Sequence, residues 1–192
     1  MKTFLLSLLL CCGLGHAQIQ AQTLKSGVFE PPRAAPEIAL PASTGKPFKL
    51  SGLRGKVVVL EFGYTHCPYV CPVSLASLAQ ARAQLGAAAA DVQVVFVTVD
   101  PERDTAGHLR TYLAKFDPSF IGISGSPGQI QGVLRDYGIS VTKQVAEGKA
   151  DYQLGHSSYL YFVDRRGMLR ALMPFGRPAA DIAHDLAILL KK

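Results

Sequence analysis

Residues 57–72 read VVVLEFGYTHCPYVCP, and this stretch decides the fold. Five of its first six residues are β-branched or apolar, with little alternation, which is typical of a central strand covered on both faces. The run ends at Gly63, and Pro72 is suited to begin a helix. A second buried run covers residues 92–99. Strand, crossover helix and strand form a βαβ unit, so we expect two parallel strands with a right-handed connection.

Weaker patterns extend this unit on both sides. Turn residues at 43–46 separate two short apolar runs and predict a β-hairpin before the central strand. Further predicted elements are a helix from Asp104 or Thr105 to the residue before Pro118, a helix over 127–137, a hairpin of 159–163 with 168–172, and a last helix from Pro178. This order predicts an α/β, thioredoxin-like fold: a central mixed sheet, flanking helices and an extra N-terminal β-hairpin.

The first 17 residues have the pattern of a secretory signal peptide. A positive charge precedes an apolar core over 4–14, and small residues occupy the −3 and −1 positions of a cleavage site after Ala17. Cleavage removes Cys11 and Cys12, so the mature chain keeps two of its four cysteines. A lipid anchor at one of these two cysteines is the weaker alternative, because neither has a clean small-residue position before it.

The remaining chain divides into a lead-in and one domain. Residues 18–36 are polar, carry three prolines and lack periodicity, which predicts a flexible or extended segment. Residues 37–192 are then expected to form a single thioredoxin-like domain. No apolar run reaches the roughly 18–20 residues that span a bilayer, so no stable membrane span is expected. Export predicts a location in the bacterial periplasm, with the chain soluble after cleavage or lightly anchored.

The chain is basic, with a formal net charge of +6. Its Lys and Arg residues are scattered, without the dense runs or interleaved aromatic residues of a nucleic-acid footprint. We therefore interpret the positive charge as a solubilising surface and expect no nucleic-acid partner.

The two mature cysteines, Cys67 and Cys71, lie at the predicted strand–helix junction. Because Pro72 disfavours helical geometry in the residue before it, Cys71 is expected at or near the N-cap and Cys67 on the preceding loop. The positive end of the helix dipole favours thiolates there. Three intervening residues allow the sulfurs to spread around a metal ion while still permitting a disulfide. These thiols are therefore expected to form a working site.

Thiolates are soft ligands that suit Cu(I) and Zn(II), but two of them leave a Cu(II) or Zn(II) site incomplete. Among the mature histidines, His156 is the best candidate for a third ligand, because its predicted loop precedes a hairpin strand and could fold back over the cysteines. His66 adjoins Cys67 and points elsewhere, His108 falls within a helix, and His184 lies on a predicted solvent face. For each histidine, an ordinary polar role remains the alternative.

Three motifs resemble the signatures of the Sco/SenC family: GYTHCPYVCP at 63–72, VDPERDT at 99–105 and GHS at 155–157. This family consists of thioredoxin-fold copper chaperones for cytochrome oxidase assembly. The resemblance implies that Cys67, Cys71 and His156 bind copper and that the recipient is the copper-site subunit of a cytochrome oxidase. The export signal implies that a reductant must keep the thiols reduced in an oxidising compartment, and we expect a thioredoxin-like one.

The chain departs from the family pattern in two respects. Tyr69 occupies a position between the cysteines where the family commonly has an aspartate, which removes a negative charge beside the metal. Many members also have a transmembrane helix, and none is expected here.

Asp100 and Asp104 lie in the second motif. Asp104 could cap the following helix and Asp100 could bond the turn at Pro101. The functional alternative is that they orient a copper ligand or contact the partner protein. Neither is expected to bind the metal itself, because a carboxylate is a harder ligand than this site needs.

The leading hypothesis is therefore an exported metallochaperone, which is not an enzyme. Its alternative is a thiol:disulfide oxidoreductase in which Cys67 attacks and Cys71 resolves the mixed disulfide. A peroxiredoxin-like peroxidase and a purely structural disulfide are less favoured hypotheses.

Overall fold

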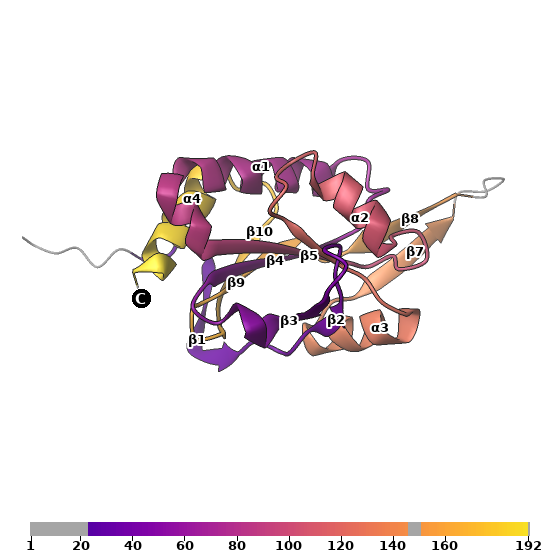
Figure 1. The fold of residues 1–192 in the computed structure, drawn as a ribbon, viewed down its shortest axis with the longest axis horizontal. Coiled ribbons are helices and arrows are strands. Elements are labelled where there is room, and N and C mark those ends of the chain that lie inside the picture. The colour runs from indigo at the N-terminus through magenta and orange to yellow at the C-terminus, as the bar shows by residue number, and fades with distance from the viewer. Residues whose placement is uncertain (1–22, 146–150, 192) are drawn as a thin grey trace, which may run out of the picture.

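The computed structural model describes residues 23–145 and 151–191. Its centre is a six-stranded sheet of order β1-β10-β9-β4-β5-β6, and two further two-stranded sheets pair β2 with β3 and β7 with β8 (Figure 1). The strands are β1 Gly27–Ala34, β2 Ala39–Pro41, β3 Pro47–Lys49, β4 Val57–Gly63, β5 Val92–Thr98, β6 Ile121–Ile123, β7 Val141–Val145, β8 Tyr152–His156, β9 Tyr159–Val163 and β10 Met168–Pro174. The helices are α1 Val70–Gln84, α2 Ala106–Leu113, α3 Pro127–Asp136 and α4 Ala179–Leu190, with short 3-10 turns at Leu50–Leu53 and Gly86–Asp91.

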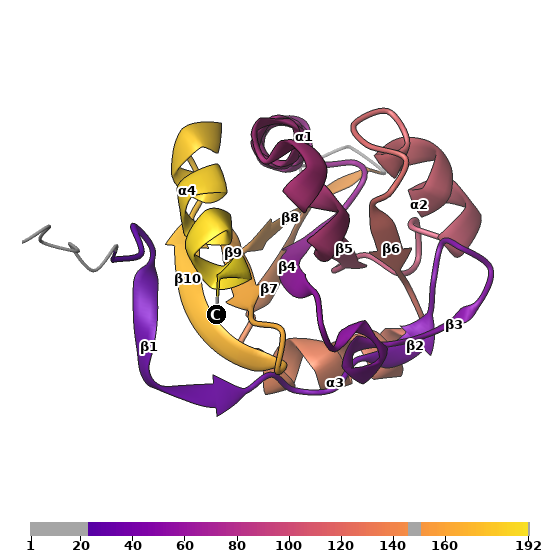
Figure 2. The same ribbon diagram turned by 60° about the vertical axis from the view of Figure 1, so that its left-hand side comes forward.

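The predicted βαβ unit is confirmed. Strands β4 and β5 are parallel and are joined through α1, while β9 pairs antiparallel with β4, so the sheet is mixed. Every residue of β4 is buried, as its continuous apolar run predicts. Helices α1, α2 and α4 cover one face of the sheet, and α3 with the β2–β3 hairpin covers the other (Figure 2).

The flanking elements also agree with the sequence. The N-terminal hairpin forms as β2 and β3, the late hairpin forms as β9 and β10, and the last helix begins directly after Pro178. In α2, Thr105 rather than Asp104 is the N-cap, because its side chain accepts from the His108 N–H. The thioredoxin-like arrangement with an extra hairpin is therefore confirmed. The expected signal peptide lies outside the described residues.

Part of the segment 18–36, expected to be a flexible or extended lead-in, is the strand β1, Gly27–Ala34. Strand β1 pairs antiparallel with β10, from Gly27 opposite Leu172 to Ala34 opposite Met168. It occupies an edge of the sheet, where Pro31 and Pro32 are tolerated because an edge strand need not donate every N–H group. The folded domain therefore begins before residue 37.

A buried carboxylate anchors the chain just before β1. The Asp185 side chain on α4 accepts from the Lys25 N–H at 2.8 Å, the Ser26 N–H at 2.9 Å and the Ser26 hydroxyl at 2.5 Å. These are long-range contacts, which local sequence patterns do not reveal.

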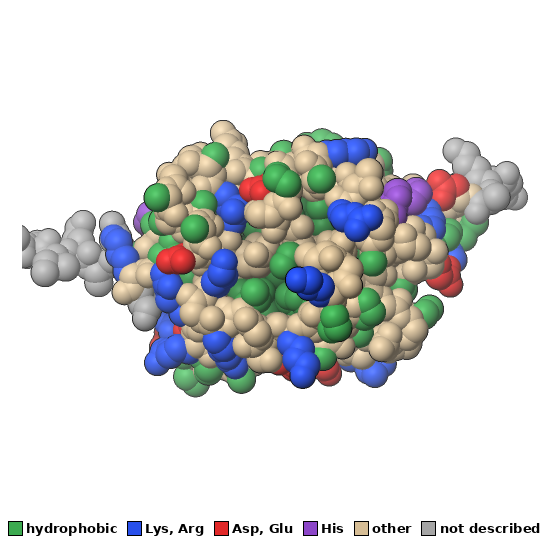
Figure 3. Space-filling view, viewed as in Figure 1, with side chains coloured by type: hydrophobic (Ala, Val, Ile, Leu, Met, Phe, Trp, Pro, Cys, Tyr) green, Lys and Arg blue, Asp and Glu red, His purple; other side chains and the backbone are tan. Residues whose placement is uncertain are grey.

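The positively charged side chains do not form a single patch on the face shown in Figure 3. Figure 3 shows Lys and Arg side chains spread over this face of the molecule rather than gathered in one band. Within residues 23–145 and 151–191, no helix is long and apolar enough to cross a membrane.

Candidate functional site

Cys67 and Cys71 are both free thiols, at the start of α1. Cys67 lies half-buried on the loop that follows β4, whereas Cys71 is buried. Helix α1 begins at Val70 with Tyr69 as N-cap, so Cys71 is the second helical residue rather than the N-cap. The predicted start at Pro72 was therefore two residues late. A proline is accepted within the first turn because its missing N–H has no partner there.

The two thiols differ in their ionisation. The Cys71 N–H lies 3.4 Å from the Cys67 Sγ. Hydrogen bonds from the Cys71 thiol and from backbone N–H groups lower the pKa of Cys67 to about 5, although partial burial opposes this. The same thiol–thiolate bond and burial raise the pKa of Cys71. At neutral pH, Cys67 is therefore a thiolate and Cys71 a protonated thiol beside it.

Gly63 lets the thiols approach the sheet closely. A Cβ atom at this position would lie 2.7 Å from the Cys71 Sγ and 2.8 Å from the Phe96 ring. The end of β4 therefore has room for Cys71 only because residue 63 has no side chain.

The sequence predicted a loop at His156. In the structure this residue is instead the last residue of β8. Its Nδ1 lies 2.9 Å from the Ser157 carbonyl oxygen, which can only accept, so Nδ1 carries the proton. The lone pair of Nε2 is then available to a metal ion.

The structure brings the predicted ligands only partly together. His156 and Cys71 line the same small cavity, together with Tyr159 and Phe175. In the described part of the chain, however, no three His, Cys, Asp or Glu residues form a group that could hold a metal ion. Binding through Cys67, Cys71 and His156 therefore requires a rearrangement of side chains.

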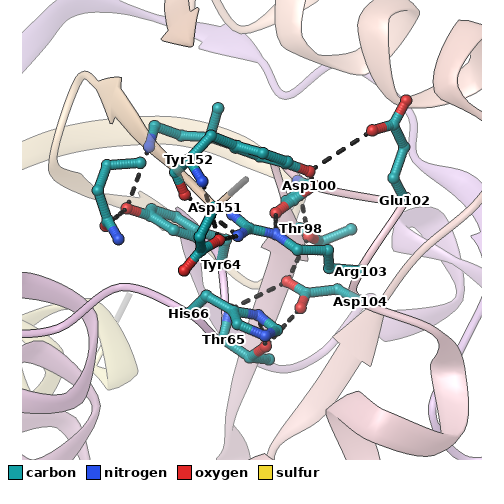
Figure 4. A network of polar contacts seen from close by, with 12 residues as sticks. Tyr64, Thr65, His66, Thr98, Asp100, Glu102, Arg103, Asp104, Asp151 and Tyr152 are labelled. Atoms are coloured by element: carbon teal, nitrogen blue, oxygen red, sulfur yellow. Dashed lines mark hydrogen bonds and ion pairs between the residues drawn. The ribbon is translucent and has the colours of Figure 1, made fainter. Parts of the chain in front are cut away.

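Asp104 is fully buried beneath the cysteine loop (Figure 4). It accepts from the Thr65 N–H at 3.0 Å, the Thr65 hydroxyl at 2.5 Å and the Thr98 hydroxyl at 2.7 Å. Asp100, also buried, accepts from the Tyr152 hydroxyl at 2.7 Å and pairs with Arg103. In this structure both carboxylates therefore bond to groups inside the fold.

The other histidines of the described residues have contacts of their own. The rings of His66 and His108 stack with centroids 6.0 Å apart, and both contact the Thr65 hydroxyl. His184 contacts Asp185 on α4.

Sequence reasoning missed Glu61. This residue lies on β4, lines the cavity shared by Cys71 and His156, and is 4% exposed. Burial raises its pKa to about 8, against the opposing effect of a hydrogen bond with Ser74, and its Oε2 has no partner among the described residues. The available signal was a single carboxylate within the apolar run of residues 57–63.

Aromatic side chains surround the thiols. Tyr69 is 65% exposed and packs edge-to-face against Phe175, with ring centroids 6.2 Å apart. Tyr159 and Val73 are also exposed. Tyr69, two residues after Cys67, therefore presents an exposed aromatic ring at the position where the family commonly has an aspartate.

The sequence is similar to known proteins over most of its length. The family model described as SCO1/SenC matches residues 30–191. A putative copper-binding protein of Stutzerimonas stutzeri is 33% identical over 175 residues, which cover 88% of this chain and 85% of that protein. The mitochondrial SCO1 homolog 1 of Arabidopsis thaliana is 38% identical over 133 residues, which are 64% of this chain but only 40% of that protein.

A solved structure of a related protein is also similar to this chain in its fold. ScoI of Bradyrhizobium japonicum, determined with copper bound, has a TM-score of 0.75 and 35% identity, covering 82% of this chain and 99% of that chain.

Proposed function

The chain belongs to the SCO1/SenC family, and on that premise we propose that it is an exported copper metallochaperone. Copper is its cargo, bound through Cys67, Cys71 and His156 and delivered to the binuclear copper site of a respiratory oxidase. The observation that carries the proposal is the Cys67 thiolate with Cys71 beside it and His156 on the same cavity as Cys71.

The donor set suits copper. Two sulfurs are soft ligands for Cu(I), and an imidazole nitrogen adds the intermediate donor that Cu(II) prefers. Cys67 is already ionised and is expected to bind first, whereas Cys71 must lose its proton when it binds. Copper uptake is therefore expected to release a proton from Cys71.

The relatives support both the cargo and the recipient. The Stutzerimonas protein is named for copper binding, and the Bradyrhizobium structure contains copper. A further structure, of BsSco, is described as a member of the Sco family of cytochrome c oxidase assembly proteins. We extend these properties to this chain, with the copper-site subunit of an oxidase as its partner.

The unequal thiols also favour a second function, a thiol:disulfide oxidoreductase acting on the partner's cysteines. The Cys67 thiolate attacks one sulfur of the partner disulfide and displaces the other as a thiolate. Cys71, after losing its proton, attacks the Cys67 sulfur and releases the second partner thiol. The partner disulfide is reduced and Cys67–Cys71 is oxidised, so a thioredoxin-like reductant must restore the dithiol.

Metal titration of the reduced protein tests the first function. Wild type is expected to bind one equivalent of Cu(I) or Cu(II). His156→Ala should lose much of its Cu(II) affinity while retaining Cu(I), and His184→Ala is the matched control, because His184 contacts Asp185 on α4. Unchanged Cu(II) binding in His156→Ala would remove His156 from the ligand set.

The same copper titration of the oxidised protein is the second part of this test. A Cys67–Cys71 disulfide consumes both thiolates, so copper binding should disappear. If copper binding is weak even in the reduced protein, while the protein reduces a dithiol–disulfide substrate peptide, the oxidoreductase function replaces the chaperone.

We also propose that residues 1–17 act as a signal peptide for export. The mature protein is then in the periplasm, either free or lightly anchored. N-terminal sequencing of protein recovered from the periplasm should begin at Gln18. Retention of residues 1–17 on an unmodified protein would contradict cleavage, and a lipid-modified cysteine at position 11 or 12 would indicate the anchored form.

A further inference from the structure

The β7–β8 hairpin, which carries His156, is separate from the central sheet. In the described residues its two strands pair only with each other, with Val141 opposite His156 and Val145 opposite Tyr152. The main ladder of hydrogen bonds therefore does not fix the height of His156 above the cysteine loop. The covalent link to β9 through residues 157–158 restrains the end of β8, and side-chain contacts from neighbouring elements must hold the rest of the strand.

Arg103 supplies the densest group of these contacts (Figure 4). Its Nη1 lies 2.7 Å from the Asp151 Oδ1 and 3.1 Å from the Tyr152 carbonyl oxygen. Its guanidinium stacks 3.7 Å above the Tyr152 ring, and its Nε donates to the buried Asp100. Because the Tyr152 hydroxyl also donates to Asp100, at 2.7 Å, the start of β8 is held at its backbone, its ring and its hydroxyl.

Tyr64 holds the middle of the same strand. Its hydroxyl donates to the Gln153 Oε1 at 2.9 Å and accepts from the Leu154 N–H at 3.2 Å. The Tyr64 ring meets the His156 ring edge-on with centroids 6.2 Å apart, and the Arg103 guanidinium lies 5.8 Å from the Tyr64 ring. Tyr64 lies three residues before Cys67, so this contact joins the hairpin to the cysteine loop.

The loop after β5 therefore holds both halves of the proposed site. Asp104 fixes the cysteine side through Thr65, and Asp100 with Arg103 fixes the histidine side through Tyr152. Only three residues of one loop separate Asp100 from Asp104. Such a short connection sets the relative position of the two sides.

We propose that Arg103 is a positioning residue that holds the β7–β8 hairpin, and with it the His156 imidazole, at the height where it reaches a copper ion bound by the cysteines. The proposal rests on the proposed function. A strand advances about 3.3 Å per residue, so a slip of β8 by a fraction of one residue removes a ligand that must be placed within about 0.5 Å. Loss of Arg103 should therefore affect the His156-dependent metal state selectively.

The experiment compares Arg103→Gln with Arg170→Gln. Arg170 is a close match, because it is also paired with a buried aspartate: the side-chain exposures are 19% for Arg170 and 5% for Asp164, against 17% for Arg103 and 3% for Asp100. Cu(II) affinity should fall about 10–100-fold in Arg103→Gln, the usual effect of removing a group that orients a metal ligand, and stay within about twofold in Arg170→Gln. Cu(I) affinity, which the two cysteines supply, should change little in either.

A double-mutant cycle separates positioning from general damage. In a His156→Ala background, adding Arg103→Gln should cause no further loss of Cu(II) affinity, because both changes remove the same ligand. Additive losses, or equal losses of Cu(I) and Cu(II), would overturn the proposal. If His156→Ala alone leaves Cu(II) affinity unchanged, His156 is not a copper ligand and the proposed ligand set fails. The role of Arg103 in holding the hairpin is then tested by a measurement on the metal-free protein.

The metal-free measurement is hydrogen exchange at the Leu154 and His156 amides. Exchange at both should accelerate in Arg103→Gln but not in Arg170→Gln, and unchanged exchange overturns the proposal. Should Arg103→Gln fail to fold, Tyr152→Phe keeps the ring stacked on Arg103 and removes only the hydroxyl, which bonds to Asp100 at 2.7 Å and to Glu102 at 3.5 Å. This variant should show the same pattern with a smaller effect, and no change in either exchange or Cu(II) affinity would also overturn the proposal.

Discussion

The Cys71 N–H points at the Cys67 Sγ from 3.4 Å, so the first turn of α1 stabilises a thiolate on the loop that precedes it. The same closeness leaves Cys71 as the proton-bearing partner. One thiol is consequently ready to react at neutral pH, and the other becomes available only after it loses a proton.

The pH dependence of Cys67 alkylation should reflect the low pKa of its thiol. The rate of modification by iodoacetamide should rise with a midpoint near pH 5, against about 8.5 for an ordinary cysteine, while Cys71 stays unmodified because it is buried. Mass spectrometry of the modified peptides distinguishes the two sites. Cys71→Ala removes the main hydrogen-bond donor and should move the midpoint upward. A wild-type midpoint near 8.5 would contradict the thiolate assignment.

Glu61 should make the protein less stable as the pH rises from about 4.5 to about 8. Its folded pKa is raised to about 8 from 4.5, so in this window the unfolded chain releases a proton that the folded chain keeps. The free energy of unfolding should fall by at most about 1.4 kcal/mol per pH unit from this group. Urea unfolding at pH 5 and pH 8 measures the difference.

The Cys67 thiol, whose pKa is lowered to about 5, contributes in the opposite sense over this window, so the contribution of Glu61 is read from the difference between wild type and Glu61→Gln. Relative to wild type, Glu61→Gln should become more stable as the pH rises from 5 to 8. Glu37→Gln is the control: the pKa of Glu37 is lowered, chiefly by hydrogen bonds with Ser51 that outweigh its partial burial. The stability from Glu37 is present above the unfolded pKa and is lost only as the pH falls through the lowered value. Glu37→Gln should therefore leave the slope between pH 5 and pH 8 intact, and an equal change in both variants would contradict the assignment to Glu61.

Gly63→Ala should destabilise the fold by about 1–3 kcal/mol, the usual cost of overpacking a core. Its new methyl group would meet the Cys71 Sγ at 2.7 Å and Phe96 at 2.8 Å. Gly107→Ala, on α2 with no atom within 4 Å of the added methyl, should be neutral or slightly stabilising. Thermal unfolding of both variants measures this, and equal melting temperatures would show that the end of β4 yields easily.

Asp185→Ala should release residues 25–26 from α4. It leaves the N–H groups of Lys25 and Ser26 without their acceptor, at a cost of about 1–3 kcal/mol for each group that stays buried. Limited proteolysis after Lys25 should become faster. Asp181→Ala removes more exposed ion pairs with Lys25 and Arg177 and should leave the protein close to wild-type stability. Equal protease sensitivity of the two variants would contradict the anchor.

The elements that the sequence predicted well have strong local patterns. The apolar run of β4, the Ser126–Pro127 start of α3 and the loop between β9 and β10 each carry their own signal. Strand β1 carries the opposite signal, because two prolines argue against a strand. It forms because β10 and Asp185 hold it from distant parts of the chain.

The site was predictable in its residue types but not in its arrangement. Motif and spacing pointed to the cysteines, His156 and the two aspartates. They did not reveal that His156 ends a strand of a separate hairpin, or that a buried Glu61 lies in the same cavity. These properties depend on how distant segments pack, which neither spacing nor periodicity records.

The prolines of β1 also affect how copies of the protein meet one another. An open sheet edge is a template on which another chain can add a strand and begin an aggregate. Here one edge strand contains Pro31, Pro32 and an irregular register between Val28 and Arg33, and the other, β6, has three residues. Neither edge of the six-stranded sheet offers a long regular row of free N–H and C=O groups, so neither is a good template for a strand from a second copy.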